Sequence, residues 1–303
     1  MMRLKQQGFT LVEMIIVIVI SGILLSIVSV FIAQPIQGFI DLSRRATLVY
    51  SAESALRRMQ RDVRRALPNS VRVRVDAGDT ALELLHTLEG ARYRAMPPPG
   101  NPLNRLQFNI LDSDFDILGN FSNLPAPFPT MPFDSTTHRI AIYNIGQVDA
   151  MGVPVAGSNA YAGPDGLGRN VITPMGRKIT YSDSGNEDHV NIDGGFQFRH
   201  DSSLNHRVYI VDTPVSYVCE NGQLLRYTGY NFTNVTQPVQ AADFVGPNTM
   251  RNLMADNVDS CTFTYAPGTS QRAGLATLDL TILDAATGEQ IRLLHQVHVD
   301  NAP

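Results

Sequence analysis

The stretch Gly8-Phe9-Thr10-Leu11-Val12-Glu13 opens a long apolar segment that carries a single acid at its edge. No charged residue occurs from Met14 to Ile32. This run of about 19 residues approaches the roughly 20 that cross a bilayer core as a helix. A carboxylate that reaches the bilayer centre costs on the order of 2.5–3.5 kcal/mol, so Glu13 requires a partner that offsets this cost.

Two common membrane-targeting segments account for this stretch only in part. A secretory signal peptide fits the basic residues Arg3 and Lys5, but the apolar run exceeds the usual h-region of about 7–15 residues, and no clear small-x-small site closes it. An ordinary signal anchor fits the length and the basic flank, but leaves Glu13 and the glycine before Phe9 unexplained. In either case the positive-inside rule keeps Arg3 and Lys5 in the cytoplasm and predicts export of the rest.

Residues 8–13 closely resemble the class III signal of type IV pilins and type II secretion pseudopilins. The resemblance implies that a prepilin peptidase cleaves between Gly8 and Phe9 and methylates the new amine of Phe9. Residues 1–8 would then be a cytoplasmic leader peptide, and 303 − 8 = 295 residues would remain. The resemblance also implies that Glu13 pairs with the terminal amine of a neighbouring subunit, which would relieve the cost of an unpaired buried carboxylate.

Helical periodicity continues beyond the apolar segment. We predict a transmembrane and filament-core helix over residues 9–34 and an amphipathic helix over residues 35–67, because Pro35 and Gly38 should kink or loosen the chain between them. Pro68-Asn69 is expected to end the second helix near Leu67. The apolar positions recur every seven residues at Leu42, Val49, Leu56 and Val63.

The opposite face of this second helix is rich in arginine and poor in acids. Such a strip is either a solvated helix face or an interface with acidic neighbours or lipid headgroups. The candidate interface residues are Arg57, Arg58, Arg61, Arg64 and Arg65.

After Pro68 the apolar residues alternate with a period of two, which predicts strands. The strongest pattern predicts strands at Ser260–Tyr265, Leu275–Leu283 and Gln290–Val299, with Leu278, Leu280 and Ile282 facing the helix. The predicted fold class is therefore α+β, in which a long N-terminal helix packs on the antiparallel β-sheet of a pilin-like globular domain over residues 68–303. The other strands are expected near residues 71–75, 81–88, 106–111, 138–145, 190–198, 207–211, 216–219 and 223–230.

Two segments interrupt this strand pattern, near residues 96–135 and 150–188. They are rich in proline or in glycine, asparagine and aspartate. Because they are too long for simple connections, we expect functional insertions or mobile loops.

The chain has two cysteines, Cys219 and Cys261, both in the exported part. An even number in an oxidising compartment predicts a disulfide, and a metal pair is the weaker alternative because no histidine cluster flanks either residue. The segment Ser216–Tyr230 contains Asn221-Gly222 and is expected to form a hairpin crosslinked to the strand at Cys261.

No enzymatic chemistry is predicted. The net charge of −4 gives no indication of nucleic-acid binding, and no spacing of residues indicates a catalytic, metal or cofactor site. Calcium binding by Asp183, Asn186, Glu187 and Asp188 stays open, because hard oxygen ligands lie at short spacing in this loop.

Two narrower resemblances indicate a subfamily. The long helix with an arginine-rich end is similar to that of J-type minor pseudopilins, and residues 218–227 (VCENGQLLRY) resemble MshO-type minor pilins of the mannose-sensitive haemagglutinin (MSHA) pilus. They imply a minor pilin at or near the pilus tip that helps to prime assembly. A tip adhesin and a minor pseudopilin of a type II secretion system stay open as alternatives.

The same resemblances imply the partners and the location. The expected partners are major and minor pilins, the prepilin peptidase and the inner-membrane assembly platform. The chain would cross the inner membrane once, with its C-terminal domain in the periplasm, and would later lie on the pilus at the cell surface.

Overall fold

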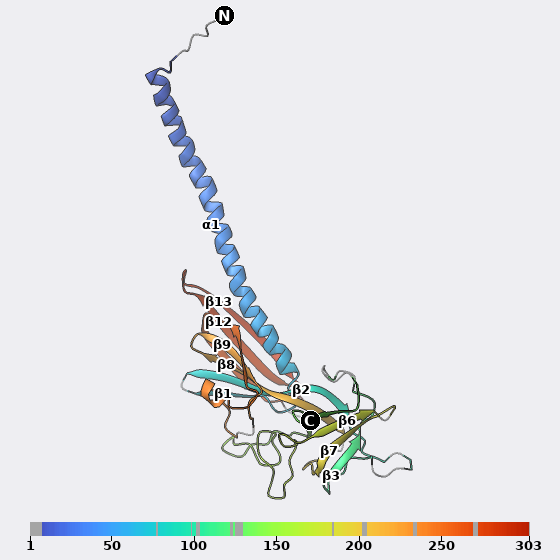
Figure 1. Ribbon diagram of the computed structural model, residues 1–303. Coiled ribbons are helices and arrows are strands. Elements are labelled where there is room, and N and C mark those ends of the chain that lie inside the picture. Colours follow the sequence, from blue (N-terminus) through green and yellow to red (C-terminus); the bar gives the residue numbers. More distant parts are fainter. Residues whose placement is uncertain are drawn as a thin grey trace, which may run out of the picture. The chain divides into compact units, whose positions relative to one another are not determined.

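The computed structural model describes residues 8–302, apart from residues 77, 98, 101–103, 122–123, 125–129, 184, 202–204, 233–234 and 269–271. The chain divides into two compact units, one ending at Tyr50 and the other beginning at Ser51. A single long helix precedes strands that pair in antiparallel sheets, so the predicted α+β fold is confirmed (Figure 1).

Helix α1 (Leu11–Arg64) contains Pro35 without interruption. The expected loosening at Pro35 and Gly38 therefore does not break the helix, because a proline removes one backbone N–H group and the neighbouring turns keep their own hydrogen bonds. The helix ends three residues before the predicted Leu67, where the N–H of Arg65 turns back to the carbonyl of Asp62 at 3.0 Å.

The part of α1 in the second unit buries one apolar stripe. Ala52, Leu56, Met59 and Val63 are buried, whereas Leu42 is 67% exposed. The seven-residue pattern is thus an intramolecular core only from Ala52 onward. The earlier part of the pattern stays available to a membrane or to other chains.

The largest sheet has the order β1-β2-β8-β9-β10, and β5 pairs with β8. The two strands predicted at 207–211 and 216–219 are one continuous strand, and the Asn221-Gly222 hairpin that follows it is confirmed. The strands of this sheet are β1 (Arg72–Asp76), β2 (Asp79–Arg92), β5 (Arg139–Ile142), β8 (Arg207–Glu220), β9 (Gln223–Thr228) and β10 (Met250–Ala255). A short 3-10 helix, η1 (Ala241–Asp243), lies between β9 and β10 in the sequence.

A three-stranded sheet contains β11 (Val258–Ala266), β12 (Gly274–Asp284) and β13 (Glu289–Val299). These strands and the turn at Gly288 confirm the strongest part of the predicted pattern. Leu278, Leu280 and Ile282 lie on one buried face. Figure 1 shows the end of α1 running along β12 and β13, and Nε2 of His295 on β13 lies 3.2 Å from Oε2 of Glu53 on the helix.

The predicted insertions contribute three strands to a four-stranded sheet rather than forming loops alone, and the fourth, β7 (Asp188–Phe196), matches the strand predicted near 190–198. The order of this sheet is β3-β7-β6-β4, and its other strands are β3 (Asp112–Asp116), β4 (Phe133–Ser135) and β6 (Ile179–Asp183). The strand predicted at residues 106–111 is wrong. The carboxylate of Asp112 accepts a hydrogen bond from the backbone N–H of Gln107 at 2.7 Å, which turns the chain there, and the strand begins at Asp112 instead.

The four-stranded sheet shares a hydrophobic core with the largest sheet. Phe115, Tyr181 and Ile192 from the four-stranded sheet belong to the same buried cluster as Ile140 on β5 and Ile210 on β8. The insertions are therefore an integral part of the second unit, held by the same apolar burial that stabilises the rest of it.

Candidate assembly site

The predicted cleavage site lies just before the helix. Gly8 and Phe9 precede the first helical residue, Leu11, and the side chain of Phe9 is 84% exposed. A Cβ atom on Gly8 would meet no atom within 4 Å. The described part of the chain thus leaves space for a larger side chain at position 8. Residues 1–7 of the predicted leader lie outside the described part of the chain.

Thr10 and Glu13 form a capping box at the start of α1. The N–H of Glu13 donates to Oγ1 of Thr10 at 3.2 Å, and the N–H of Thr10 donates to Oε2 of Glu13 at 3.0 Å. This reciprocal pair satisfies two backbone donors that a helix start leaves unpaired. The sequence reasoning missed the motif, although Thr-x-x-Glu before an apolar run is its signature.

The second oxygen of the Glu13 carboxylate is open. The Thr10 hydroxyl also donates to Oε2, at 3.1 Å. Among the described residues, none donates a hydrogen bond to Oε1 of Glu13. The carboxylate is therefore oriented by its own chain while it keeps one oxygen free for an external donor.

The helix that follows exposes apolar side chains along its length. The segment Leu11–Ser29 is long and apolar enough to cross a membrane. Its large side chains are exposed on all sides, as at Leu11, Ile18, Leu24 and Leu25. Such a surface fits a bilayer core or a bundle of similar helices.

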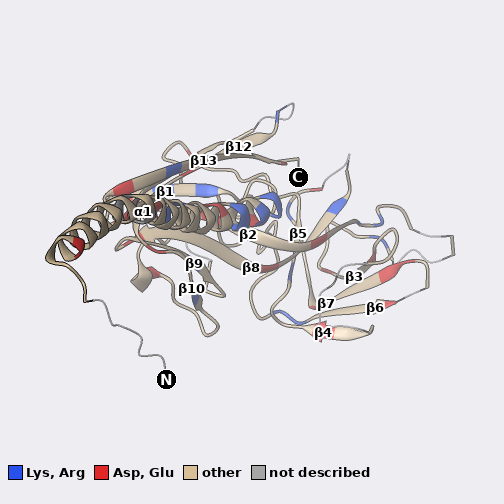
Figure 2. Cartoon of the chain, turned by 90° about the horizontal axis from the view of Figure 1, so that it is seen from above, with Lys and Arg blue, Asp and Glu red and all other residues tan. Residues whose placement is uncertain are grey.

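The five arginines of the candidate interface are all exposed, and they fall into two groups. Arg57 pairs with Glu53 at 2.6 Å and Arg58 pairs with Asp62 at 3.3 Å. Arg61, Arg64 and Arg65 have no carboxylate within ion-pair distance in the described part of the chain. Figure 2 shows this basic group as blue segments at the end of α1.

Asp62 is a structural residue that the sequence reasoning missed. Its side chain is buried, and Oδ2 accepts hydrogen bonds from the Tyr217 hydroxyl and from Nε of Arg226, both at 2.8 Å. These bonds join the last turn of α1 to β8 and β9. The arginine strip is therefore carried on a helix end that is fixed to the sheet.

Cys219 on β8 and Cys261 on β11 form the predicted disulfide, with their Cα atoms 6.4 Å apart. Asn221 and Gly222 have φ angles of 50° and 73°, as a tight two-residue hairpin turn requires. The disulfide joins the largest sheet to the three-stranded sheet, so it crosslinks two elements that do not pair through their backbones.

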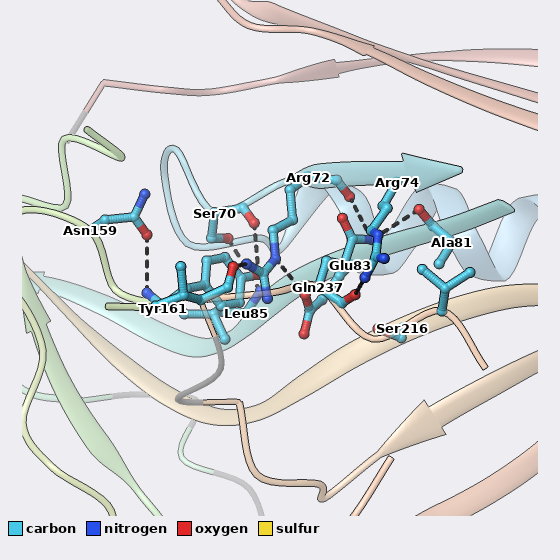
Figure 3. A network of polar contacts seen from close by, with 12 residues as sticks. Ser70, Arg72, Arg74, Ala81, Glu83, Leu85, Asn159, Tyr161, Ser216 and Gln237 are labelled. Carbon is cyan, nitrogen blue, oxygen red and sulfur yellow. Dashed lines mark hydrogen bonds and ion pairs between the residues drawn. The ribbon is translucent and has the colours of Figure 1, made fainter. Parts of the chain in front are cut away.

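A buried polar network lies between β1, β2 and β8 (Figure 3). The fully buried Glu83 pairs with Nε of Arg72 at 2.5 Å and accepts a hydrogen bond from the Tyr230 hydroxyl at 2.8 Å. Burial raises the pKa of Glu83, and the charge of Arg72 opposes this effect. The guanidinium of Arg72 also lies 3.7 Å from the ring centroid of Tyr161. The partners of this network lie within the chain, so we assign it a structural role.

The acidic loop proposed for calcium does not gather its carboxylates. Glu187 accepts a hydrogen bond from Nε of Arg94 at 3.0 Å. Asp188 accepts hydrogen bonds from the side chain of Asn120 and from the N–H of Phe121. In the part of the chain that the structure describes, no three potential metal ligands cluster.

A family model described as the prokaryotic N-terminal methylation motif matches residues 3–29. This match supports a type IV pilin-like or pseudopilin protein, a class whose shared motif is structural rather than catalytic. With the apolar helix, it supports a membrane-anchored chain whose globular domain lies outside the cytoplasm. No curated protein and no solved structure matches the chain significantly.

Proposed function

We propose that this chain is a minor type IV pilin of the MshO type, which helps to prime assembly of an MSHA-type pilus. Prepilin peptidase would cleave between Gly8 and Phe9 and methylate the amine of Phe9. The observation that carries the proposal is the Thr10–Glu13 capping box, which orients a carboxylate with one free oxygen at the start of an exposed apolar helix.

The assembly step is non-covalent. Apolar helices of neighbouring subunits cover the exposed face of α1, which removes Glu13 from water. An unpaired carboxylate is unfavourable in such surroundings, and the terminal amine of a neighbour on Oε1 relieves that cost. Only one axial register brings the amine to the carboxylate, so the pair favours that register.

The size of the second unit supports a position at the filament tip. This unit runs from Ser51 to the end of the chain and contains a four-stranded sheet built largely from the insertions. If every subunit of the filament shaft carried a unit of this size, neighbouring units would clash. A single copy at the end of the filament meets less obstruction.

We propose the arginine strip as a contact with neighbouring minor pilins. Arg57, Arg58, Arg61, Arg64 and Arg65 are exposed, and the last three lack a carboxylate partner in the described ranges. An acidic surface on a neighbour would complement them. The inner-membrane assembly platform would bind the chain while the chain is still in the membrane, before the chain enters the pilus.

The decisive experiment is a count of surface pili by electron microscopy in a strain that lacks this gene. Few or no pili, restored by the wild-type gene, support the priming role. Normal pili that fail to attach would support a tip adhesin instead, for which the structured insertions provide the surface. Normal pili with normal attachment would contradict both and support a minor pseudopilin of a secretion system.

A further inference from the structure

Arg139, the first residue of β5, is a buried arginine. Arg139 is 4% exposed, and its buried Nη2 atom has no hydrogen-bond partner among the described residues. Within the ranges that the structure describes, no carboxylate pairs with the guanidinium. The guanidinium lies over the ring of Phe232, whose centroid is 4.0 Å from the central carbon of the guanidinium.

The charge of Arg139 therefore lacks a compensating carboxylate among the residues that the structure describes. Burial lowers the pKa of Arg139 to about 9, which still leaves the guanidinium protonated at neutral pH. The Phe232 ring offsets only part of the desolvation, since a cation–π contact is weaker than the cost of burying an unpaired charge. Buried charges in folded proteins are normally paired, so an anionic partner from outside the chain is expected.

A cavity of about 430 Å³ provides the place for this partner. Arg139 and Arg177 both line it, and its apolar wall includes Ile172, Met175 and Phe196. The volume falls within the roughly 300–1,000 Å³ that is usual for small-molecule sites. A charged group beside an apolar wall is the arrangement that binds an organic acid rather than a bare inorganic ion.

Arg177 supplies a second guanidinium at the rim of the cavity. Its Nη1 atom donates to the carbonyls of Asp193 and Gly195, at 2.6 Å and 3.2 Å. These bonds hold the guanidinium in place without neutralising its charge, and no carboxylate pairs with it among the described residues. Gly194 permits the close approach, because a Cβ atom there would lie 2.9 Å from Nη1 of Arg177.

We propose that this cavity is a binding site for a small organic carboxylate. The carboxylate group accepts hydrogen bonds from Arg139 and Arg177, and the body of the ligand lies against Ile172, Met175 and Phe196. Arginine presents its donors as a planar fork that matches a carboxylate. The site lies in the second unit and does not depend on the proposed role in pilus assembly.

The test is calorimetric titration of the full chain in a nonionic detergent at neutral pH. The probes are D-glucuronate and benzoate, which share a carboxylate but differ in body. Their neutral counterparts, D-glucose and benzamide, measure the binding that the rest of the ligand gives without a carboxylate. Inorganic phosphate measures the binding of an anion without an organic part. We expect at least one carboxylate to bind, and to bind more tightly than its neutral counterpart and than phosphate.

Three variants assign the binding to the cavity. Arg139→Met and Arg177→Gln should each weaken binding by about tenfold or more, as expected for a lost charge-assisted hydrogen bond. Arg251→Gln removes an exposed arginine of β10 that does not line the cavity, and should leave affinity unchanged. Arg139→Met should also keep or raise the thermal midpoint without ligand, because it removes an uncompensated buried charge.

The proposal fails if neither carboxylate binds, or if phosphate or a neutral counterpart binds as tightly. It also fails if Arg177→Gln, which changes only the rim, binds the carboxylate as well as the wild type. If Arg139→Met does not fold, the Arg177→Gln result decides. A normal pilus count in the deletion strain would contradict the priming role and leave this binding result unaffected.

Discussion

Asp62, in the last turn of α1, accepts a hydrogen bond at 2.8 Å from the hydroxyl of Tyr217 on β8. The same carboxylate oxygen accepts a hydrogen bond from Nε of Arg226 on β9. One buried acid thus joins the helix end to two strands that lie more than 150 positions later in the sequence. This contact fixes the segment that carries the arginine strip.

We predict that Asp62→Ala lowers the free energy of unfolding by about 3 kcal/mol, because it leaves Arg226 and Tyr217 without their acceptor. Tyr217→Phe should cost about 1 kcal/mol, as for one lost hydrogen bond. Urea unfolding of the full chain in detergent measures both. Asp41→Ala is the matched control, because Asp41 is 69% exposed and pairs with a partly exposed arginine. Equal midpoints for the Asp62 and Asp41 variants would contradict the prediction.

Glu13 combines a capping role with a proposed pairing role, and two variants separate them. Glu13→Gln can keep the capping hydrogen bonds but loses the charge, whereas Glu13→Val loses both. We expect both variants to be cleaved after Gly8 and both to be depleted from sheared pili. Immunoblots of the membrane and pilus fractions measure the distribution. If Glu13→Gln enters pili as well as the wild type, helix capping suffices and the amine-pairing argument is wrong.

The unpaired arginines give a prediction about partner binding. Arg61→Glu and Arg64→Glu should each reduce copurification of neighbouring minor pilins several-fold, because an acidic partner surface would now be repelled. Raising the salt concentration should weaken the wild-type complex as well. Arg251→Glu, which changes an exposed arginine on β10 rather than on the helix, serves as the control. Unchanged copurification in the two helix variants would assign these arginines to a solvated face.

The Cys219–Cys261 disulfide should contribute about 4 kcal/mol to stability, as the chain-entropy model gives for a loop of this length. Because one bond is lost in every case, Cys219→Ser, Cys261→Ser and the double variant should be destabilised equally. Urea unfolding measures this equality. Reduction of the wild type should increase its mass by two hydrogens, which verifies the bond itself. A double variant clearly less stable than either single variant would indicate that the cysteines act separately.

Asp165 gives the chain an acid-sensitive contact. Desolvation by burial raises its pKa, but hydrogen bonds from Arg169 and Leu167 outweigh this effect and hold the pKa at about 2, below the ordinary 3.8. Its contribution to stability is therefore present above pH 3.8 and is lost as the pH falls toward about 2. Asp165→Asn should lower the thermal midpoint near neutral pH, and the difference from the wild type should shrink across this window. A difference independent of pH would overturn the assignment.

Local sequence patterns were sufficient for the parts of the fold that depend on neighbouring residues. The apolar run after Glu13 predicted α1, and alternation with a turn predicted β12 and β13. The same approach misplaced a strand at residues 106–111, because the bond from Gln107 to Asp112 has no signature in hydrophobic periodicity. The Thr10–Glu13 capping box was readable from its spacing, since it too is local.

The sequence by itself determined the N-terminal motif, the apolar helix, the α+β class and the terminal hairpins, because each depends on side chains a few positions apart. Only the tertiary structure decided that the insertions contribute strands to a sheet, that Asp62 contacts Tyr217, and that Arg139 and Arg177 line one cavity. These relationships join residues far apart in the chain. Their energies come from burial and from charges brought together by the whole fold, and no local spacing records them.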